Sequence, residues 1–130
     1  MNALDYFNAR LEATISPMDY LKSNQTNPES YFLVDVRNGP PHVRSLTIKD
    51  AHILPEQELA LRLDEIPKDK EIIVYCSDVW CNTAAKTAKY LLERGYKVKE
   101  LTGGITAWQE MGFPVSDSSE KTAAADHCGC

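Results

Sequence analysis

The sequence has no surplus of positive charge. Its 14 Lys and Arg residues are outnumbered by 19 Asp and Glu residues, and its formal net charge is −5. Proteins that bind nucleic acid or anionic membranes usually carry a basic patch that supplies much of their affinity. The composition therefore predicts neither a nucleic acid nor a membrane surface as a partner.

Long apolar runs are also missing. No stretch approaches the ~20 apolar residues that a membrane-spanning helix needs. The opening segment, MNALDYFNARLEATIS, lacks the basic start and apolar run of a secretory signal. We therefore expect a cytoplasmic protein, whose 4 cysteines are thiols or ligands rather than structural disulfides because the cytoplasm is reducing.

The most informative segment has the pattern strand, cysteine, loop and helix. Residues 71–75 are apolar and β-branched, which predicts a buried strand that ends at Cys76, and a helix is predicted from Asn82 to Gly95. A thiol between a strand end and a helix N-terminus lies where backbone N–H groups and the helix dipole favour an anion. Such surroundings lower the pKa of a cysteine and make it reactive. A buried structural cysteine is the competing interpretation.

Predicted strands and helices alternate along the rest of the chain. Further strands are expected over 31–37, 51–55 and 97–101, and helices over 3–12, 17–23, 56–65 and 103–112, whereas 42–50 reads as a helical turn or a loop. This alternation is typical of an α/β fold, with a parallel sheet covered by helices on both faces. Ligands of such sheets bind beyond the carboxyl ends of the strands. Asp35, Arg37 and Cys76 are therefore expected at the functional edge.

The loop after Cys76 distinguishes two chemistries. Phosphate-ester hydrolysis needs a cation to hold the phosphate dianion, normally an Arg six residues after the cysteine. That position is Asn82 here, and no Arg or Lys lies between Cys76 and Lys86. In sulfur transfer, a thiolate takes up a sulfane sulfur as a persulfide, which loop N–H groups alone can hold. The loop therefore favours sulfur transfer over phosphatase or arsenate-reductase chemistry.

Four segments resemble the signatures of the rhodanese family, in order and with similar spacing. They are LVDVR at 33–37, KDAHILP at 49–55, VYC at 74–76 and LTGGITAWQEMGFPV at 101–115. The resemblance implies a three-layer α/β/α rhodanese-like fold with a parallel sheet of about five strands, and sulfurtransferase activity with Cys76 as the catalytic residue. The rhodanese-like domain would span residues 14–115, leaving 1–13 as an N-terminal helical extension and 116–130 as a flexible tail.

The active loop departs from the usual family pattern C-x-x-G-x-R. It reads CSDVWCN and resembles a subgroup whose loop is C-x-x-x-x-C-N, which makes Cys81 a candidate resolving or second thiol. The loop residues expected to bind the substrate or the persulfide are Ser77, Asp78, Val79, Trp80, Cys81 and Asn82. Asp35 and Arg37 are expected to support the edge as an ion pair. The missing cation and the charge of Asp78 count against thiosulfate, which is a dianion.

We also expect specific surroundings for the thiol. Cys76 should be partly accessible, ringed by the N–H groups of residues 77–82, with its pKa below the ~8.5 of a free thiol. Trp80 reads as an exposed aromatic that could line a substrate pocket, and Trp108 as a core residue. His52 could act as an acid or base, although a structural histidine is the more usual finding.

Two functions remain open. One is a sulfurtransferase that moves sulfane sulfur from a small donor, thiosulfate or a persulfide, to cyanide, a thiol or a protein acceptor. The other is a non-catalytic rhodanese-type interaction or thiol redox-sensing module, in which Cys76 and Cys81 form a reversible disulfide. No cofactor or metal is expected. The end of the chain, His127, Cys128 and Cys130, could form half of a soft-metal site or a mobile thiol pair, but three ligands within four residues cannot close a tetrahedral zinc site alone.

Overall fold

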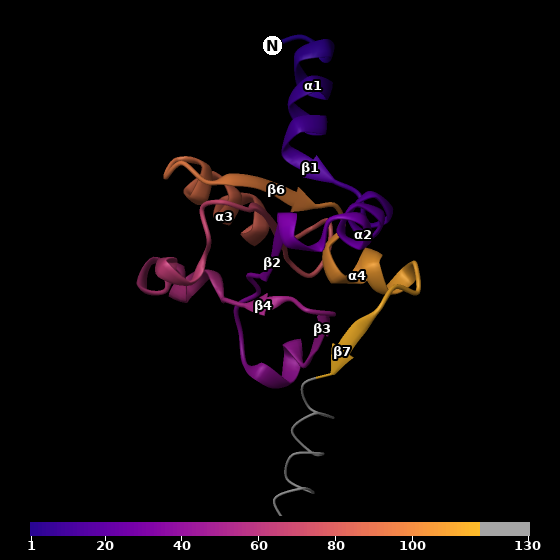
Figure 1. Cartoon of the computed structure of the whole chain (residues 1–130), viewed down its shortest axis with the longest axis vertical. Coiled ribbons are helices and arrows are strands. Elements are labelled where there is room, and N and C mark those ends of the chain that lie inside the picture. Colours follow the sequence, from indigo (N-terminus) through magenta and orange to yellow (C-terminus); the bar gives the residue numbers. More distant parts are fainter. Residues whose placement is uncertain (118–130) are drawn as a thin grey trace, which may run out of the picture.

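The computed structural model describes residues 1–117 of the chain (Figure 1). Its helices are α1 (Ala3–Ala13), α2 (Pro17–Thr26), α3 (Thr83–Leu92) and α4 (Gly104–Glu110), with short 3-10 helices η1 (Pro28–Ser30), η2 (Pro41–Arg44), η3 (Glu56–Leu61) and η4 (Leu63–Glu65). Its strands are β1 (Thr14–Ile15), β2 (Tyr31–Asp35), β3 (Leu46–Ile48), β4 (His52–Ile53), β5 (Glu71–Tyr75), β6 (Lys97–Leu101) and β7 (Val115–Asp117). None of the helices in this part of the chain has the length and apolar character needed to cross a bilayer.

Five strands form one parallel sheet in the order β1-β6-β5-β2-β4. Strand β5 lies at its centre and pairs with β2 along its full length, from Tyr31 opposite Glu71 to Asp35 opposite Tyr75. This register brings the carboxyl ends of both strands to the same edge, with Cys76 one residue beyond β5. The predicted α/β fold with a parallel sheet of about five strands is therefore confirmed.

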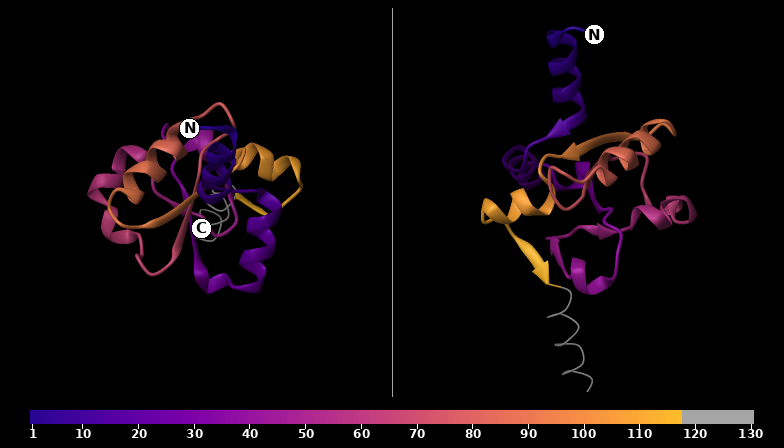
Figure 2. Two further views of the ribbon diagram at one scale, coloured as in Figure 1. Left: turned by 90° about the horizontal axis from the view of Figure 1, so that it is seen from above. Right: turned by 180° about the vertical axis from the view of Figure 1, so that it is seen from behind.

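Helices cover both faces of the sheet, and β5 supplies each of the two cores through alternating side chains. Ile72 and Val74 face the core beneath α3, whereas Ile73 and Tyr75 face the core beneath α2 and α4. Figure 2 shows α3 on one side of the sheet and α2 with α4 on the other. Trp108 is 2% exposed in the second core, as predicted for a core residue.

Two strands outside the parallel sheet form a separate antiparallel ribbon. Strand β3 lies in the segment that read as a turn or a loop, and it pairs with β7 at the end of the described chain. Ordered structure therefore continues to Asp117, beyond the domain end predicted at residue 115. The remainder of the predicted tail, including His127, Cys128 and Cys130, lies outside the described residues.

The start of helix α4 is docked directly on the chain that leaves β5. The N–H of Ile105 donates to the carbonyl oxygen of Cys76 at 3.1 Å, and that of Thr106 donates to the carbonyl oxygen of Ser77 at 2.9 Å. This contact requires glycine at position 104, where φ is +60° and a Cβ would lie 2.2 Å from the carbonyl oxygen of Cys76. The helix therefore fixes the backbone of the cysteine from one side.

We predict that Gly104→Ala destabilises the protein far more than Gly112→Ala. Both glycines have positive φ, but nothing lies within 4 Å of a Cβ built at Gly112. The control should show only the backbone strain of about 1–2 kcal/mol, whereas Gly104→Ala adds overpacking worth roughly 1–3 kcal/mol. Urea unfolding of both variants measures the difference, and equal losses would show that the close approach of α4 is dispensable.

Candidate active site

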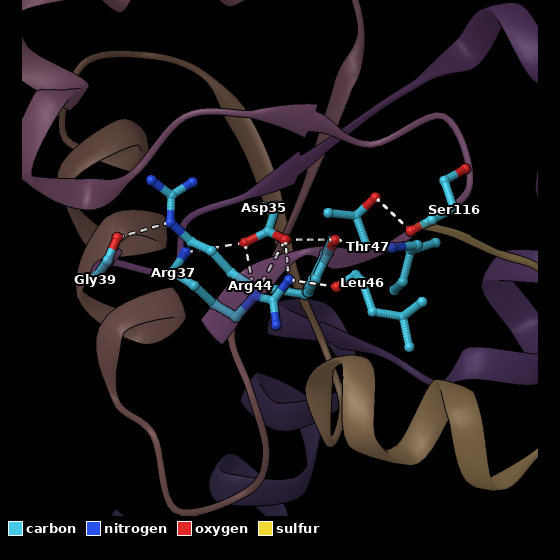
Figure 3. Close-up of polar contacts among 9 residues, drawn as sticks. Asp35, Arg37, Gly39, Arg44, Leu46, Thr47 and Ser116 are labelled. Atoms are coloured by element: carbon cyan, nitrogen blue, oxygen red, sulfur yellow. Dashed lines mark hydrogen bonds and ion pairs between the residues drawn. The ribbon is translucent and has the colours of Figure 1, made fainter. Parts of the chain in front are cut away.

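The carboxylate of Asp35 lies at the end of β2 and is 1% exposed. Arg37 binds this carboxylate through several hydrogen bonds. Its Nη2 donates to Oδ2 at 2.7 Å, and its Nε and backbone N–H donate to Oδ1 at 3.1 and 3.0 Å. Figure 3 shows the arginine folded back onto the carboxylate. Buried charges are tolerated when they are paired and hydrogen-bonded, and this pair satisfies both conditions.

Tyr75, the last residue of β5, joins this ion pair to β3. Its hydroxyl donates to Oδ2 of Asp35 at 2.8 Å and accepts the N–H of Ile48 at 3.0 Å. Burial and the nearby Asp35 carboxylate raise the pKa of Tyr75, which keeps the phenol protonated and able to donate. Because Arg37 also donates to the carbonyl oxygen of Leu46 at 2.7 Å, the network binds three segments at the functional edge.

Cys76 follows Tyr75 and is joined to Cys81 by a disulfide across the loop. The two Cα atoms lie 6.3 Å apart, within the ordinary range for bridged cysteines. This disulfide differs from the expectation that the cysteines of the chain are thiols or ligands. Its geometry fits the prediction that these two cysteines can pair.

The expected accessibility of Cys76 is wrong for this disulfide form. The residue is 5% exposed and belongs to the core beneath α3, while the start of α4 covers its carbonyl oxygen. The expected ring of N–H groups also differs, because two of them bond Asp78. The N–H of Trp80 donates to its carboxylate at 3.0 Å, and that of Cys81 donates to its carbonyl oxygen at 3.3 Å.

The outer part of the loop faces solvent. Val79 is 68% exposed and Trp80 is 86% exposed, whereas Cys81 is half-buried against the core. Asn82 occupies the N-cap position of α3, as the predicted helix start requires, but its side chain makes no capping hydrogen bond. The loop thus has a buried sulfur at its base and an exposed apolar tip.

Structural contacts explain the position of His52 without a role as an acid or base. Its Nε2 lies 2.6 Å from Oε1 of Glu65, and its ring packs on Phe32 with centroids 5.2 Å apart. The pKa of Glu65 is lowered to about 2. The hydrogen bond from Arg62 is the largest cause, and the hydrogen bond from His52 is the next largest. Among residues 1–117, no group of three or more His, Cys, Asp and Glu side chains is arranged to hold a metal ion.

Comparison with known proteins identifies the family to which this chain belongs. A model of the Rhodanese-like domain matches residues 17–111. The chain belongs to the rhodanese-like family. A protein named Sulfurtransferase from Allochromatium vinosum is 34% identical over 96 residues, which are 73% of this chain and 87% of the relative. An HTH-type transcriptional regulator from Mycobacterium tuberculosis is 35% identical over 89 residues, covering 67% of this chain and 38% of the regulator.

Solved structures agree with this family. The crystal structure of a full-length protein from Lactobacillus plantarum has a TM-score of 0.82 at 28% identity, covering 88% of this chain and 95% of that one. The resemblance inferred from the four sequence segments is therefore confirmed. Family membership and the relative named Sulfurtransferase support a sulfurtransferase-type function.

The role of the Tyr75 hydroxyl in this rhodanese-like domain was not predicted from the sequence. Tyr75 read only as part of a buried strand, yet its hydroxyl connects Asp35 to β3. The polar neighbour on the adjacent strand, Asp35, was the available signal, because buried carboxylates require donors. The predicted grouping of Asp35 with Arg37 does occur, and the arginine is committed to that carboxylate rather than to the loop.

We predict that Tyr75→Phe costs roughly 1–3 kcal/mol of stability at pH 7, because a buried N–H and a buried carboxylate oxygen each lose a partner. The folded pKa of Tyr75 is raised, so its contribution is present below the unfolded value of ~10 and falls as pH rises beyond it. The variant should therefore lose less stability between pH 9 and 11 than the wild type, in the range around the ~10 of an unfolded tyrosine. Urea unfolding across this range measures both effects.

The matched control is Tyr6→Phe, which removes a hydroxyl from a 52% exposed ring on α1. It should leave stability at pH 7 unchanged. A Tyr75→Phe protein as stable as the wild type at pH 7 would contradict the role assigned to this hydroxyl.

Proposed function

We propose that the protein is a sulfurtransferase that carries sulfane sulfur as a persulfide on Cys76. The observation that carries the proposal is the position of this residue at the carboxyl end of the central strand β5. It lies there between the buried Asp35 network and the docked start of α4. The name of the Allochromatium vinosum relative is consistent with this activity.

The reaction starts from the dithiol form of the protein. The Cys76 thiolate attacks the outer sulfur of the donor, and an S–S bond forms on Cys76 while the S–S bond of the donor breaks. Sulfite leaves with the bonding electrons when the donor is thiosulfate, and a thiolate leaves when it is a persulfide. Attack by cyanide or an acceptor thiolate on the outer sulfur then yields thiocyanate or a new persulfide and regenerates the Cys76 thiolate.

Cys81 provides a second route by which the persulfide on Cys76 is resolved. Its thiol attacks the inner sulfur on Cys76, so that a Cys76–Cys81 bond forms and the outer sulfur leaves as hydrosulfide with the Cys81 proton. The sulfane sulfur is reduced and the two thiols are oxidised, which balances the step. The Cα separation of 6.3 Å supports this route, because the product disulfide fits the loop.

Two observations also favour the alternative of a non-catalytic interaction or redox-sensing module. The same disulfide would serve as the oxidised state of a thiol sensor, and a family relative is named a transcriptional regulator. The two functions differ in turnover. A sensor would cycle between dithiol and disulfide without passing sulfur to an acceptor.

We predict that Cys76→Ser abolishes sulfur transfer to cyanide, since an alcohol cannot hold the persulfide. Cys81→Ser should keep a substantial part of the activity, because it removes only the resolving thiol. Initial rates with the reduced proteins and a persulfide donor measure both effects. The reverse pattern would make Cys81 the carrier, and reduced wild type that forms no product would favour the sensor.

A second prediction concerns the charge of Asp78. Asp78→Asn removes this charge but keeps an oxygen that can accept the N–H of Trp80. Two unit charges about 4 Å apart in water interact by about 1 kcal/mol, so kcat/KM for thiosulfate should rise several-fold at low salt. The gain should shrink at high ionic strength, where exposed charges are screened.

The control for this substitution is Asp64→Asn, which removes an exposed charge from η4. It lowers the net negative charge by the same amount without touching the loop. If both variants gain equally, the effect comes from net charge and the loop charge does not limit the use of anionic donors.

A further inference from the structure

The two sulfurs of the loop disulfide differ in their surroundings. Cys76 is 5% exposed and packs in the core beneath α3, and its backbone is covered by the start of α4. Cys81 is half-buried and follows the exposed residues Val79 and Trp80. A molecule that approaches from solvent therefore reaches Cys81 more readily than Cys76.

Access decides which sulfur of a disulfide is attacked by an external thiolate. The attacking thiolate approaches roughly in line with the S–S bond, from the far side of the sulfur that it attacks. Cys76 is enclosed in packed side chains, whereas Cys81 packs on the core with one part open to solvent, so attack on Cys81 meets less obstruction. Opening the bridge at Cys81 releases Cys76 as the leaving thiolate, which is the group that sulfur transfer requires.

The exposed tip of the loop has the character of a protein-binding contact. Trp80 lies next to the accessible sulfur, and tryptophan is strongly enriched among residues that dominate binding energy. The tip is also fixed in shape, because Asp78 accepts the N–H groups of Trp80 and Cys81. A loop backbone that is already ordered loses less entropy on binding, which favours recognition by a partner.

We propose that a dithiol protein docks on Val79 and Trp80 and reduces the disulfide by attacking the sulfur of Cys81. The partner's thiolate forms a mixed disulfide with Cys81, and Cys76 leaves as a thiolate. The partner's second thiol then attacks the partner's own sulfur in that mixed disulfide, and Cys81 leaves as a thiol with its proton. The partner is oxidised to a disulfide as the loop gains two electrons. The inference deepens the proposed function, because it restores the thiol on which the persulfide forms.

The site of attack is tested by trapping the mixed disulfide. The oxidised protein is mixed with a thioredoxin whose second active-site cysteine is replaced by serine, so that the complex cannot resolve. Chymotrypsin cuts after Trp80 and separates the two cysteines onto different peptides. The thioredoxin peptide should be linked to Cys81, and linkage to Cys76 would overturn the proposal.

The docking contact is tested with Trp80→Ala. The measured quantity is the rate of disulfide reduction by intact thioredoxin divided by the rate with dithiothreitol, which is too small to need a docking surface. This ratio should fall about tenfold, as expected for loss of a tryptophan that anchors an interface. The matched control is Leu61→Ala, since Leu61 is 88% exposed on η3 and should leave the ratio unchanged.

An unchanged ratio in Trp80→Ala would overturn the docking surface and make small thiols the reductants. An equal fall in both variants would also overturn it, because the effect would not be specific to the loop. Persulfide formation is measured separately on Cys81→Ser reduced with dithiothreitol, in which the persulfide cannot be resolved by a second loop thiol. Its absence would overturn the proposed function and leave the linkage result standing, so the two failures are distinguishable.

Discussion

At the carboxyl edge of the sheet, the carboxylate of Asp35 accepts hydrogen bonds from two side chains. The arrangement of the segments at this edge depends on these bonds. Arg37 and Tyr75 donate to this carboxylate, while the same two side chains hold Leu46 and Ile48 of β3. Removing one member of a buried charged pair leaves an uncompensated charge, which costs several kcal/mol. Since Tyr75 directly precedes Cys76, the network also sets the point from which the active loop starts.

The loop is held a second time by helix α4, whose first N–H groups bond the carbonyl oxygens of Cys76 and Ser77. Between these attachments and α3 lies the turn from Asp78 to Cys81. That turn contains an acid and an apolar tip but no cation, and the charge of Arg37 is neutralised by Asp35. For the proposed sulfurtransferase, these features favour donors and acceptors that do not rely on attraction between opposite charges.

Much of the fold could be predicted from the sequence, because β2 and β5 are largely apolar runs and α3 has a clear helical period. Strands β1, β3 and β7 were missed because each has at most three residues and pairs with a distant segment, such as Leu46 with Asp117. The partial accessibility expected for Cys76 was wrong for a related reason. The residue belongs to a core cluster that includes Val36 and Leu54, which come from distant parts of the chain. Local patterns identified the cysteine, but contacts between remote segments set its environment.

The proposed function requires that Cys76 carries the transferred sulfur. Its most direct test is the intact mass of the reduced protein after incubation with a persulfide donor, followed by chymotryptic mapping that separates Cys76 from Cys81. We expect the gain of one sulfur atom on the Cys76 peptide, most clearly in Cys81→Ser, where the persulfide cannot be resolved. Added sulfur found only on the Cys81 peptide of the wild type, or no added sulfur in Cys81→Ser, would contradict the proposal.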